Sequence, residues 1–358
     1  MEPRTREDLD RIPGYRQGRS AVAGDAPSHK LSSNENPYDP LPSVQRRIAE
    51  LLGRINLYPD MAGAALVPEL ARRHGVDPAR IVLGAGSVEV VSQLIRATAG
   101  PGEEVLFAWR SFEAYPLLVV SAGAVPVQVP LTTDLAHDLP AMLAAITDRT
   151  RLVVVCNPNN PTGTVVGAAE LDAFLDAVPA HVVVLIDEAY REFDTSTDRP
   201  DGVALAEERP NVVVAHTFSK AYGLAGVRVG YAIAPVAVAE AMRKVAVPFG
   251  VTGLAQAAAA ASLDAQDELL DRVRALVAER ERVVAALVAQ GWELATTQAN
   301  FVWLPTGEST EQAVAVLERH GVLARAFPDE GVRVSIGTFE ANNAVLAACA
   351  ELRAAVAA

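Results

Sequence analysis

The stretch HTFSKAYGLAGVRVGY, residues 216–231, follows an apolar run and contains one of only three lysines in the chain. These lysines are Lys30, Lys220 and Lys244, whereas arginine supplies nearly all of the other positive charge. Lys220 stands among Ser, Gly and Ala, ahead of Arg228. A lone lysine in a loop is usually solvated. Whether this one has a chemical role must therefore be judged from the motifs around it.

The composition is that of an ordinary globular protein. The chain has 358 residues, of which 50% are hydrophobic and 21% charged, and its length suggests a large domain with a smaller one. A formal net charge of −13 argues against nucleic acid or an anionic membrane as partner. Two cysteines, Cys156 and Cys349, are too few for a disulfide framework and fit a reducing compartment. The polar N-terminus resembles no signal peptide, and no apolar run is long enough to span a membrane, so we predict a cytoplasmic protein.

Seven short apolar runs predict the strands of an α/β domain. Most are continuous Val, Ile and Leu runs, which is typical of strands buried on both faces of a mostly parallel sheet. Helical spacing marks segments such as 43–55, 86–99 and 168–178. The predicted strands cover residues 81–83, 104–107, 125–129, 152–156, 182–186, 212–216 and 229–233.

The pattern changes after Pro248, where a smaller α+β module is predicted. Helical patterns cover residues 254–262, 263–290, 309–320 and 341–357, and short strands are predicted at 299–304 and 331–336. We therefore divide the chain into three parts. These are an extended N-terminal arm (1–40) that packs with the small domain and the active site, a large domain (41–250) and a small domain (251–358).

An aspartate ends one of the apolar strands, in LIDEAY (residues 185–190). A carboxylate is costly to bury without a cationic partner, and ligands bind at strand ends in open α/β sheets. Asp187 is therefore a candidate for ligand binding. A helix N-cap aspartate, which needs no ligand, is the alternative.

Two further loops carry groups suited to a ligand. CNPNNPTG, residues 156–163, is stiffened by two prolines and presents asparagine amides in fixed directions. LGAGSVEV, residues 83–90, is a Gly-rich turn into a helix, where free backbone N–H groups can bind an anion. The hydroxyls of Thr217 and Ser219, together with Arg228, suit a phosphate group.

Taken together, these loops supply an anion site, a carboxylate, an amide and an amine. This combination fits pyridoxal 5′-phosphate (PLP), which has a phosphate, a ring nitrogen, a phenolic oxygen and an aldehyde. The aldehyde explains why Lys220 must be lysine, because a primary amine forms the Schiff base. No metal is implied by these motifs.

The order NPNNPTG, DEAY, SKAYGLAGVRVGY and GVRVSIG resembles the fold-type I PLP-dependent aminotransferases over nearly the whole chain. Within them it is similar to the histidinol-phosphate and aromatic aminotransferase branch. The segment WRSFEAYP, residues 109–116, resembles the aromatic enzymes more, because histidinol-phosphate enzymes usually have Pro-x-Tyr there. Gly86 and Ser87 also stand where histidinol-phosphate enzymes often have acidic residues. The resemblance implies an α/β large domain with a mostly parallel seven-stranded sheet and a smaller α+β domain.

The resemblance also implies roles for individual residues. Lys220 would bind the aldehyde and move the proton, with Asp187 and Tyr190 as its catalytic partners. Asp187 would pair with the ring nitrogen. The phenolic oxygen would bind Asn160 and Tyr190, and Phe112 would stack on the ring. The phosphate would be held by Ala85, Gly86, Ser87, Thr217, Ser219, Arg228 and, from the partner subunit of a homodimer with shared sites, the residue Tyr58.

Substrate binding is assigned to a further group of residues. Arg333 would bind the substrate carboxylate through a bidentate contact, with Arg325 as a second anion ligand. Asn34, Tyr38 and Tyr115 are expected beside the aromatic side chain.

The predicted reaction transfers the amino group between an aromatic amino acid (Phe, Tyr or Trp) and 2-oxoglutarate in a ping-pong cycle. Histidinol-phosphate aminotransferase is the alternative, and both activities in one enzyme are compatible with the sequence. More distant alternatives are a PLP-dependent decarboxylase of the same fold and a non-catalytic effector-sensing domain. The second lacks support, because the chain has no spare basic segment for DNA binding.

Overall fold

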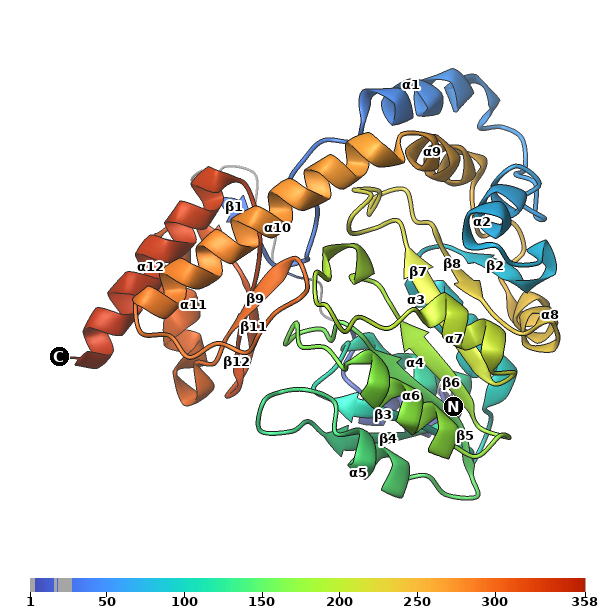
Figure 1. The fold of residues 1–358 in the computed structure, drawn as a ribbon, viewed down its shortest axis with the longest axis horizontal. Helices are drawn as coiled ribbons and strands as arrows, with labels where there is room; N and C mark the ends of the chain where they lie inside the picture. Colours follow the sequence, from blue (N-terminus) through green and yellow to red (C-terminus); the bar gives the residue numbers. More distant parts are fainter. Residues whose placement is uncertain (1–3, 16–17, 19–27, 358) are drawn as a thin grey trace.

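The fold is built around one mixed sheet, with a smaller unit beside it (Figure 1). A computed structural model describes residues 4–15, 18 and 28–357. Within these residues the large sheet has the strand order β2-β8-β7-β6-β5-β3-β4. Its strands are β2 (Ile81–Gly84), β3 (Glu104–Trp109), β4 (Val125–Pro130), β5 (Thr150–Cys156), β6 (Val183–Asp187), β7 (Val212–Thr217) and β8 (Gly230–Ile233). All seven predicted strands are confirmed.

The sheet is mostly parallel, as predicted. Only β8 runs against its neighbours, pairing antiparallel with β7 and with β2. Asp187 lies opposite both Cys156 of β5 and Ala215 of β7. The loops that follow these three parallel strands therefore leave the sheet at the same edge, and this edge carries the motifs.

Helices cover both faces of the sheet, which explains the continuous apolar strands. Side chains alternate between the faces, so that Phe107 and Val154 pack on one side while Leu106 and Val153 pack on the other. The first face is covered by α3 (Ser87–Thr98), α4 (Ala114–Ala122) and α8 (Val236–Val245). The second is covered by α5 (Leu139–Ala144), α6 (Ala168–Ala177) and α7 (Gly202–Glu208).

A third apolar cluster joins the edge of the sheet to α1 (Pro42–Leu51), α2 (Leu66–His74) and α9 (Gly253–Asp264). Ala255 and Ala258 of α9 are fully buried in this cluster. From Val273 onward, the following helix packs in the small unit instead. We therefore propose that the units divide within that helix, α10 (Gln266–Ala289), between Leu269 and Val273, later in the chain than the predicted residue 250.

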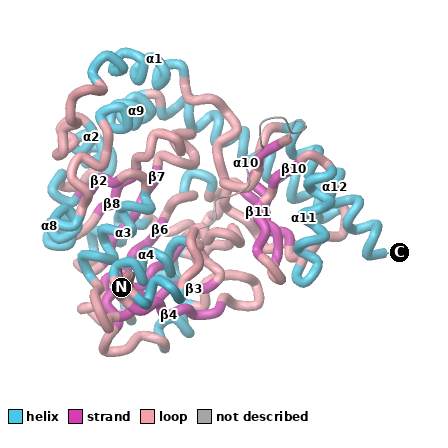
Figure 2. The backbone as a smooth tube through the Cα atoms, turned by 180° about the vertical axis from the view of Figure 1, so that it is seen from behind, coloured by secondary structure: helices cyan, strands magenta, loops and turns pink. Residues whose placement is uncertain are grey.

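The small unit combines a three-stranded antiparallel sheet with three helices. The strand order is β11-β12-β9, and a separate short sheet joins β1 of the N-terminal arm to β10. Figure 2 shows these strands beside α11 and α12, with the C-terminus at the far end of α12. The elements are β1 (His29–Lys30), α10 (Gln266–Ala289), β9 (Phe301–Leu304), α11 (Thr310–Arg319), β10 (Val322–Leu323), β11 (Arg325–Phe327), β12 (Gly331–Ser335) and α12 (Phe339–Ala357).

Other features differ from the predicted pattern in detail. The helical pattern at 263–290 is divided, because α9 ends and α10 begins around Ala265. The arm is not wholly extended, and its residues 16–17 and 19–27 lie outside the described part of the chain. Among the described residues no helix is long and apolar enough to cross a bilayer. Short 3-10 turns are η1 (Glu7–Arg11), η2 (Leu52–Arg54), η3 (Pro78–Arg80), η4 (Arg191–Phe193) and η5 (Gly307–Ser309).

Candidate active site

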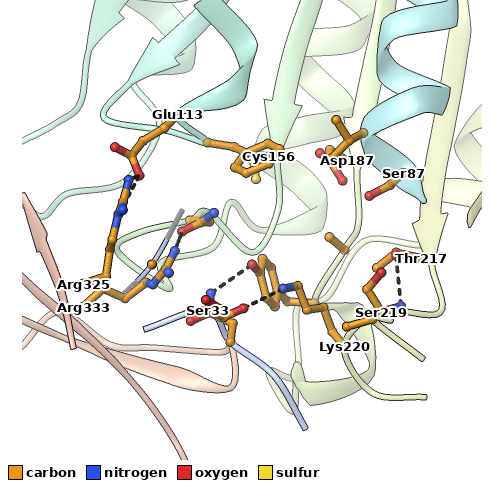
Figure 3. Close-up of a pocket in the computed structure, with 18 of the residues that line it drawn as sticks. Ser33, Ser87, Glu113, Cys156, Asp187, Thr217, Ser219, Lys220, Arg325 and Arg333 are labelled. Carbon is orange, nitrogen blue, oxygen red and sulfur yellow. Dashed lines mark hydrogen bonds and ion pairs between the residues drawn. The ribbon is translucent and has the colours of Figure 1, made fainter. Parts of the chain in front are cut away.

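A pocket lies where the loops after the parallel strands meet the small unit and residues 32–34 of the arm. Figure 3 shows hydroxyl-bearing residues at one end, arginines at the other, and Lys220 between them. Twelve of the predicted site residues line this pocket: Asn34, Ser87, Phe112, Asn160, Asp187, Tyr190, Thr217, Ser219, Lys220, Arg228, Arg325 and Arg333. The sequence motifs are therefore brought together from distant parts of the chain.

Lys220 follows the buried strand β7 and points into the pocket. Its Nζ donates a hydrogen bond to the carbonyl oxygen of Ser33 at 3.0 Å. Burial lowers the pKa of Lys220 to about 7, and the positive charge of Arg333 adds to this effect. A substantial fraction of this amine is therefore neutral and nucleophilic near neutral pH.

Asp187 ends strand β6 at the floor of the pocket and is buried. Its Oδ2 accepts a hydrogen bond from the hydroxyl of Tyr115 at 2.7 Å, whereas its Oδ1 has no partner within the described protein. Burial raises the pKa of Asp187 to about 6, while the hydrogen bond from Tyr115 opposes this rise. A buried carboxylate oxygen without a partner is costly, so this atom fits a cationic ligand group.

The hydroxyl end of the pocket is formed by the start of α3 and the loop after β7. Ser87 opens α3, where the first backbone N–H groups have no partner within the helix. Arg228 lies across this turn, with Nη2 donating to the Ala85 carbonyl at 3.2 Å and Nη1 to Ser219 Oγ at 3.4 Å. Its backbone is left-handed, with φ 64°, a strained state that is common at functional sites.

The backbone N–H groups of Ala85 and Gly86 have partners within the turn. The N–H of Ala85 donates to the side chain of Glu89, and the N–H of Gly86 donates to the carbonyl of Gly84 at 2.8 Å. These two donors are therefore engaged, and neither residue lines the pocket. Of the three residues expected to hold a phosphate through their backbone, Ser87 is the one that lines the pocket.

Arg333 dominates the opposite end and is buried. Its Nη1 donates to Asn160 Oδ1 at 2.5 Å and its Nη2 to the Ser32 carbonyl at 2.6 Å, whereas its Nε has no partner in the described protein. Burial lowers the pKa of Arg333. Its hydrogen-bond partners are neutral oxygens, so its charge is available to an anion. Arg325 differs, because it forms an ion pair with Glu113.

The amide loop is held rigidly by its own asparagines. Asn157 bonds both backbone groups of Val166, while Asn159 bonds Thr162 and the carbonyl of Arg110. These contacts fix Asn160, whose side chain lines the pocket. The sequence predicted a stiff loop that presents asparagine amides in fixed directions. These hydrogen bonds show how the loop is held.

Tyr190 and Asn34 are coupled to one another at the pocket wall. Asn34 Nδ2 donates to the Tyr190 hydroxyl at 3.0 Å, and Asn34 has a left-handed backbone with φ 53°. Phe112 also lines the pocket and packs edge-to-face on Tyr115, with ring centroids 5.5 Å apart.

Besides Ala85 and Gly86, three predicted residues lie outside the pocket. Tyr115 is 1% exposed and bonds Asp187, so it positions the carboxylate and cannot contact a substrate side chain. Tyr38 is 39% exposed and lies beside Arg272. Tyr58 is 82% exposed and packs on Phe249. Because Tyr58 is exposed and does not line this pocket, it does not contribute to the pocket of its own chain.

Sequence reasoning missed other residues that shape the pocket. Glu113 and Cys156 line it, although both stand inside motifs that the sequence singles out. Ser33 contributes only its backbone carbonyl, which no residue type predicts. Tyr15 of the arm also lines the pocket. The partners of Glu113 and Ser33 are Arg325 and Lys220, which lie far away in sequence, so local patterns carry no signal for these two contacts.

The mixed sheet, the smaller α+β unit and a pocket lined by a half-buried lysine and a buried aspartate define a fold-type I transferase, as predicted. A family model described as aminotransferase class I and II matches residues 27–348. The chain belongs to this aminotransferase family.

Similar proteins cover the chain almost completely. An "aromatic amino acid aminotransferase" of Streptomyces avermitilis is 59% identical over 344 residues, covering 96% of each chain. Its namesake in Streptomyces coelicolor is 56% identical over 351 residues, covering 98% of each. A crystal structure of histidinol-phosphate aminotransferase from Sinorhizobium meliloti in complex with pyridoxal-5'-phosphate has a TM-score of 0.85 and 30% identity, covering 93% of each chain. The prediction of an aminotransferase is confirmed.

Proposed function

We propose that this aminotransferase uses PLP to move an amino group between an aromatic amino acid and 2-oxoglutarate. The observation that carries the chemistry is the pairing of Lys220, with its lowered pKa, and Asp187, with an unpaired buried oxygen, in one pocket. The aromatic substrate is supported by the relatives at 59% and 56% identity that are named for it. The likeness to the histidinol-phosphate enzyme is one of fold, at 30% identity.

The residues present fit the cofactor. Asp187 Oδ1 is buried without a partner, which suits the protonated ring nitrogen. At the other end, a Cβ on Gly230 would lie 2.5 Å from the backbone nitrogen of Ser87, so the turn leaves room beside its N–H groups only because glycine is there. We assign the phosphate to Ser87, Thr217, Ser219 and Arg228.

PLP supplies an aldehyde that accepts the amine and a ring that stabilises negative charge at the substrate Cα. Lys220 would hold and move the proton of the substrate Cα at its Nζ, a role suited to an amine with a pKa of about 7. Asp187 keeps the ring nitrogen protonated, and Tyr115 holds the Asp187 carboxylate in place. Asn160 and Tyr190 are the proposed donors to the phenolic oxygen.

Arg333 is the proposed carboxylate ligand, because it is buried and its Nε is free to complete a bidentate contact. Phe112 lies beside the proposed ring position. Asn34 lines the pocket together with Arg333, which bonds the carbonyl of Ser32 in the same segment of the arm. Tyr38 and Tyr115 no longer belong to the proposed substrate pocket.

A homodimer with shared sites is part of the proposal. Large apolar side chains are exposed in the segments 52–61 and 247–249, which do not line the pocket. Exposed apolar clusters of this kind mark protein interfaces. Tyr58 packs on Phe249 with ring centroids 4.6 Å apart. The exposed side chains of this cluster are Leu52, Ile55, Leu57, Tyr58, Met61, Val247 and Phe249.

We also place the protein in the cytoplasm. Both cysteines, Cys156 and Cys349, are free and buried, which fits a reducing compartment.

A single-turnover experiment tests the function. The PLP-loaded protein is mixed with phenylalanine and, separately, with histidinol phosphate, and the cofactor absorbance is followed. We expect much faster conversion by phenylalanine. Faster conversion by histidinol phosphate would reject the aromatic assignment, and carbon dioxide as product would indicate a decarboxylase.

A further inference from the structure

Two arginines face the pocket from adjacent strands. Arg325 of β11 and Arg333 of β12 are directly opposite one another in an antiparallel pair, so their side chains share one face of the sheet. Figure 3 shows both at the same end of the pocket. Like charges in this arrangement repel, and the repulsion is strongest where water is scarce.

Glu113 compensates only one of these charges. Its Oε2 accepts from Arg325 Nη2 at 2.8 Å and from Nε at 3.1 Å, and both side chains are largely shielded, with 30% and 13% exposure. Within the described residues, Arg333 bonds only the neutral oxygens of Asn160 and Ser32. This end of the pocket therefore offers one guanidinium group without an acidic hydrogen-bond partner among the described residues, whereas Arg228 lies at the opposite, hydroxyl end.

We propose that Glu113 determines the charge preference of the substrate pocket. By neutralising Arg325, it leaves a single place for an anion at the arginine end of the pocket, at Arg333. This arrangement favours a substrate with one carboxylate and an uncharged side chain over a dicarboxylate or a phosphate monoester. The inference rests on the proposed function and names a specificity-determining residue for it.

The physical reason is that a second anion competes with Glu113 for Arg325. An anion at Arg325 must displace Glu113, which then loses its cation while still partly shielded from water. A phosphate monoester carries even more charge and meets the Glu113 carboxylate directly. Such repulsion against the wrong ligand is an effective source of specificity. In the second half-reaction, 2-oxoglutarate must overcome the same barrier, so Glu113 weakens its binding.

The chain provides a matched control in a second ion pair between the same two units. Arg110 follows β3, and its Nε lies 2.8 Å from each carboxylate oxygen of Glu330, at the turn before β12. Glu330 does not line the pocket. Substitution of Glu330 therefore removes a similar contact between the units without releasing charge in the pocket.

The test compares PLP-loaded Glu113→Gln and Glu330→Gln with the wild-type enzyme. Binding of two unreactive acids, glutarate and 3-phenylpropionate, is measured by calorimetry. We expect Glu113→Gln to bind glutarate roughly tenfold more tightly, because a charge-assisted contact becomes available. Its affinity for 3-phenylpropionate should be unchanged within about twofold. Single-turnover conversion by glutamate should improve in the same variant.

Two results would overturn the inference. One is an equal change for both acids in Glu113→Gln, and the other is the same gain in glutarate affinity in Glu330→Gln, which would assign the effect to movement of the two units. Because the acids do not react, this assay is independent of the proposed reaction. Failure of the wild-type enzyme to convert phenylalanine would reject the proposed function, while the glutarate affinities would still decide the role of Glu113.

Discussion

The hydroxyl of Tyr115 lies 2.7 Å from Asp187 Oδ2 and supports the charge of a carboxylate that burial disfavours. We predict that Tyr115→Phe raises the pKa of Asp187 further and lowers kcat/KM about tenfold, as expected from losing a hydrogen bond to a charged group. The ring remains, so packing against Phe107 and Phe112 should be kept.

Two measurements check this prediction. Steady-state kinetics with phenylalanine report the loss of rate, and the affinity of cofactor-free protein for PLP reports the weaker support of the ring nitrogen. Thermal unfolding of the variant shows whether the core is intact. If kcat/KM and cofactor affinity both equal the wild-type values, Tyr115 has only a packing role.

Lys220 gives a pH prediction. Its pKa is lowered from 10.5 to about 7, so the folded protein loses this proton at a lower pH than the unfolded chain does. The charged Lys220 lowers the free energy of unfolding. This loss of stability is fully present below about pH 7 and disappears as pH rises toward 10.5. We therefore expect cofactor-free protein to take up PLP faster as pH rises, with a midpoint near 7.

Stopped-flow absorbance at a series of pH values measures this uptake. Lys220→Arg serves as the control, since it keeps a cation at this position without a reactive amine. A midpoint well above pH 9 in the wild-type protein would show that the lysine is not desolvated in solution.

At the scale of elements, the turn between β2 and α3 depends on glycine. Gly86 has φ 83°, and a Cβ there would collide with the guanidinium of Arg228, lying 3.0 Å from its Cζ and closer to Nη2. We predict that Gly86→Ala displaces Arg228 and weakens PLP binding by at least about tenfold, the scale of one lost charge-assisted contact.

Gly102 separates the two effects of that substitution. It has φ 81°, and a Cβ there meets nothing within 4 Å, so Gly102→Ala introduces similar backbone strain without a collision. Both variants should lose comparable stability in urea unfolding, while only Gly86→Ala should lose cofactor affinity in a fluorescence titration. Equal cofactor affinities in the two variants would contradict a role for the Arg228 contact.

The elements also show what can be predicted from sequence. The strands were found because each is a continuous apolar run, and Asp187 and Lys220 were found because they follow such runs. Contacts that join distant segments were not found. The Tyr115–Asp187 bond spans 72 positions and the Arg325–Glu113 pair spans 212. Periodicity reports which face is buried, whereas these pairs depend on how the units pack.

At the scale of the whole molecule, one helix ties the two units together. Figure 1 shows α10 running from α9 into the small unit. Its buried Arg280 donates to the carbonyl of Phe193 at 2.8 Å and to that of Ala299 at 3.3 Å. The pocket lies between these units, so its arginine end, on β11 and β12, is positioned relative to Lys220 by this connection.

The proposed dimer gives the last prediction. Tyr58 lies outside the pocket of its own chain and is 82% exposed, so it can serve a phosphate only in the partner's site. Lys220→Ala should be inactive, and Tyr58→Phe should lose about tenfold in activity at low PLP concentration.

In a hybrid dimer, the Tyr58→Phe subunit keeps Lys220 and receives the intact tyrosine from the other subunit. Random exchange of equal amounts makes half of the dimers hybrid, with one complete site each, so activity should recover to about a quarter of the wild-type value. The assay is transamination of phenylalanine after subunit exchange, with dimers verified by sedimentation. Activity that stays at the average of the two separate variants would mean that Tyr58 does not cross between subunits.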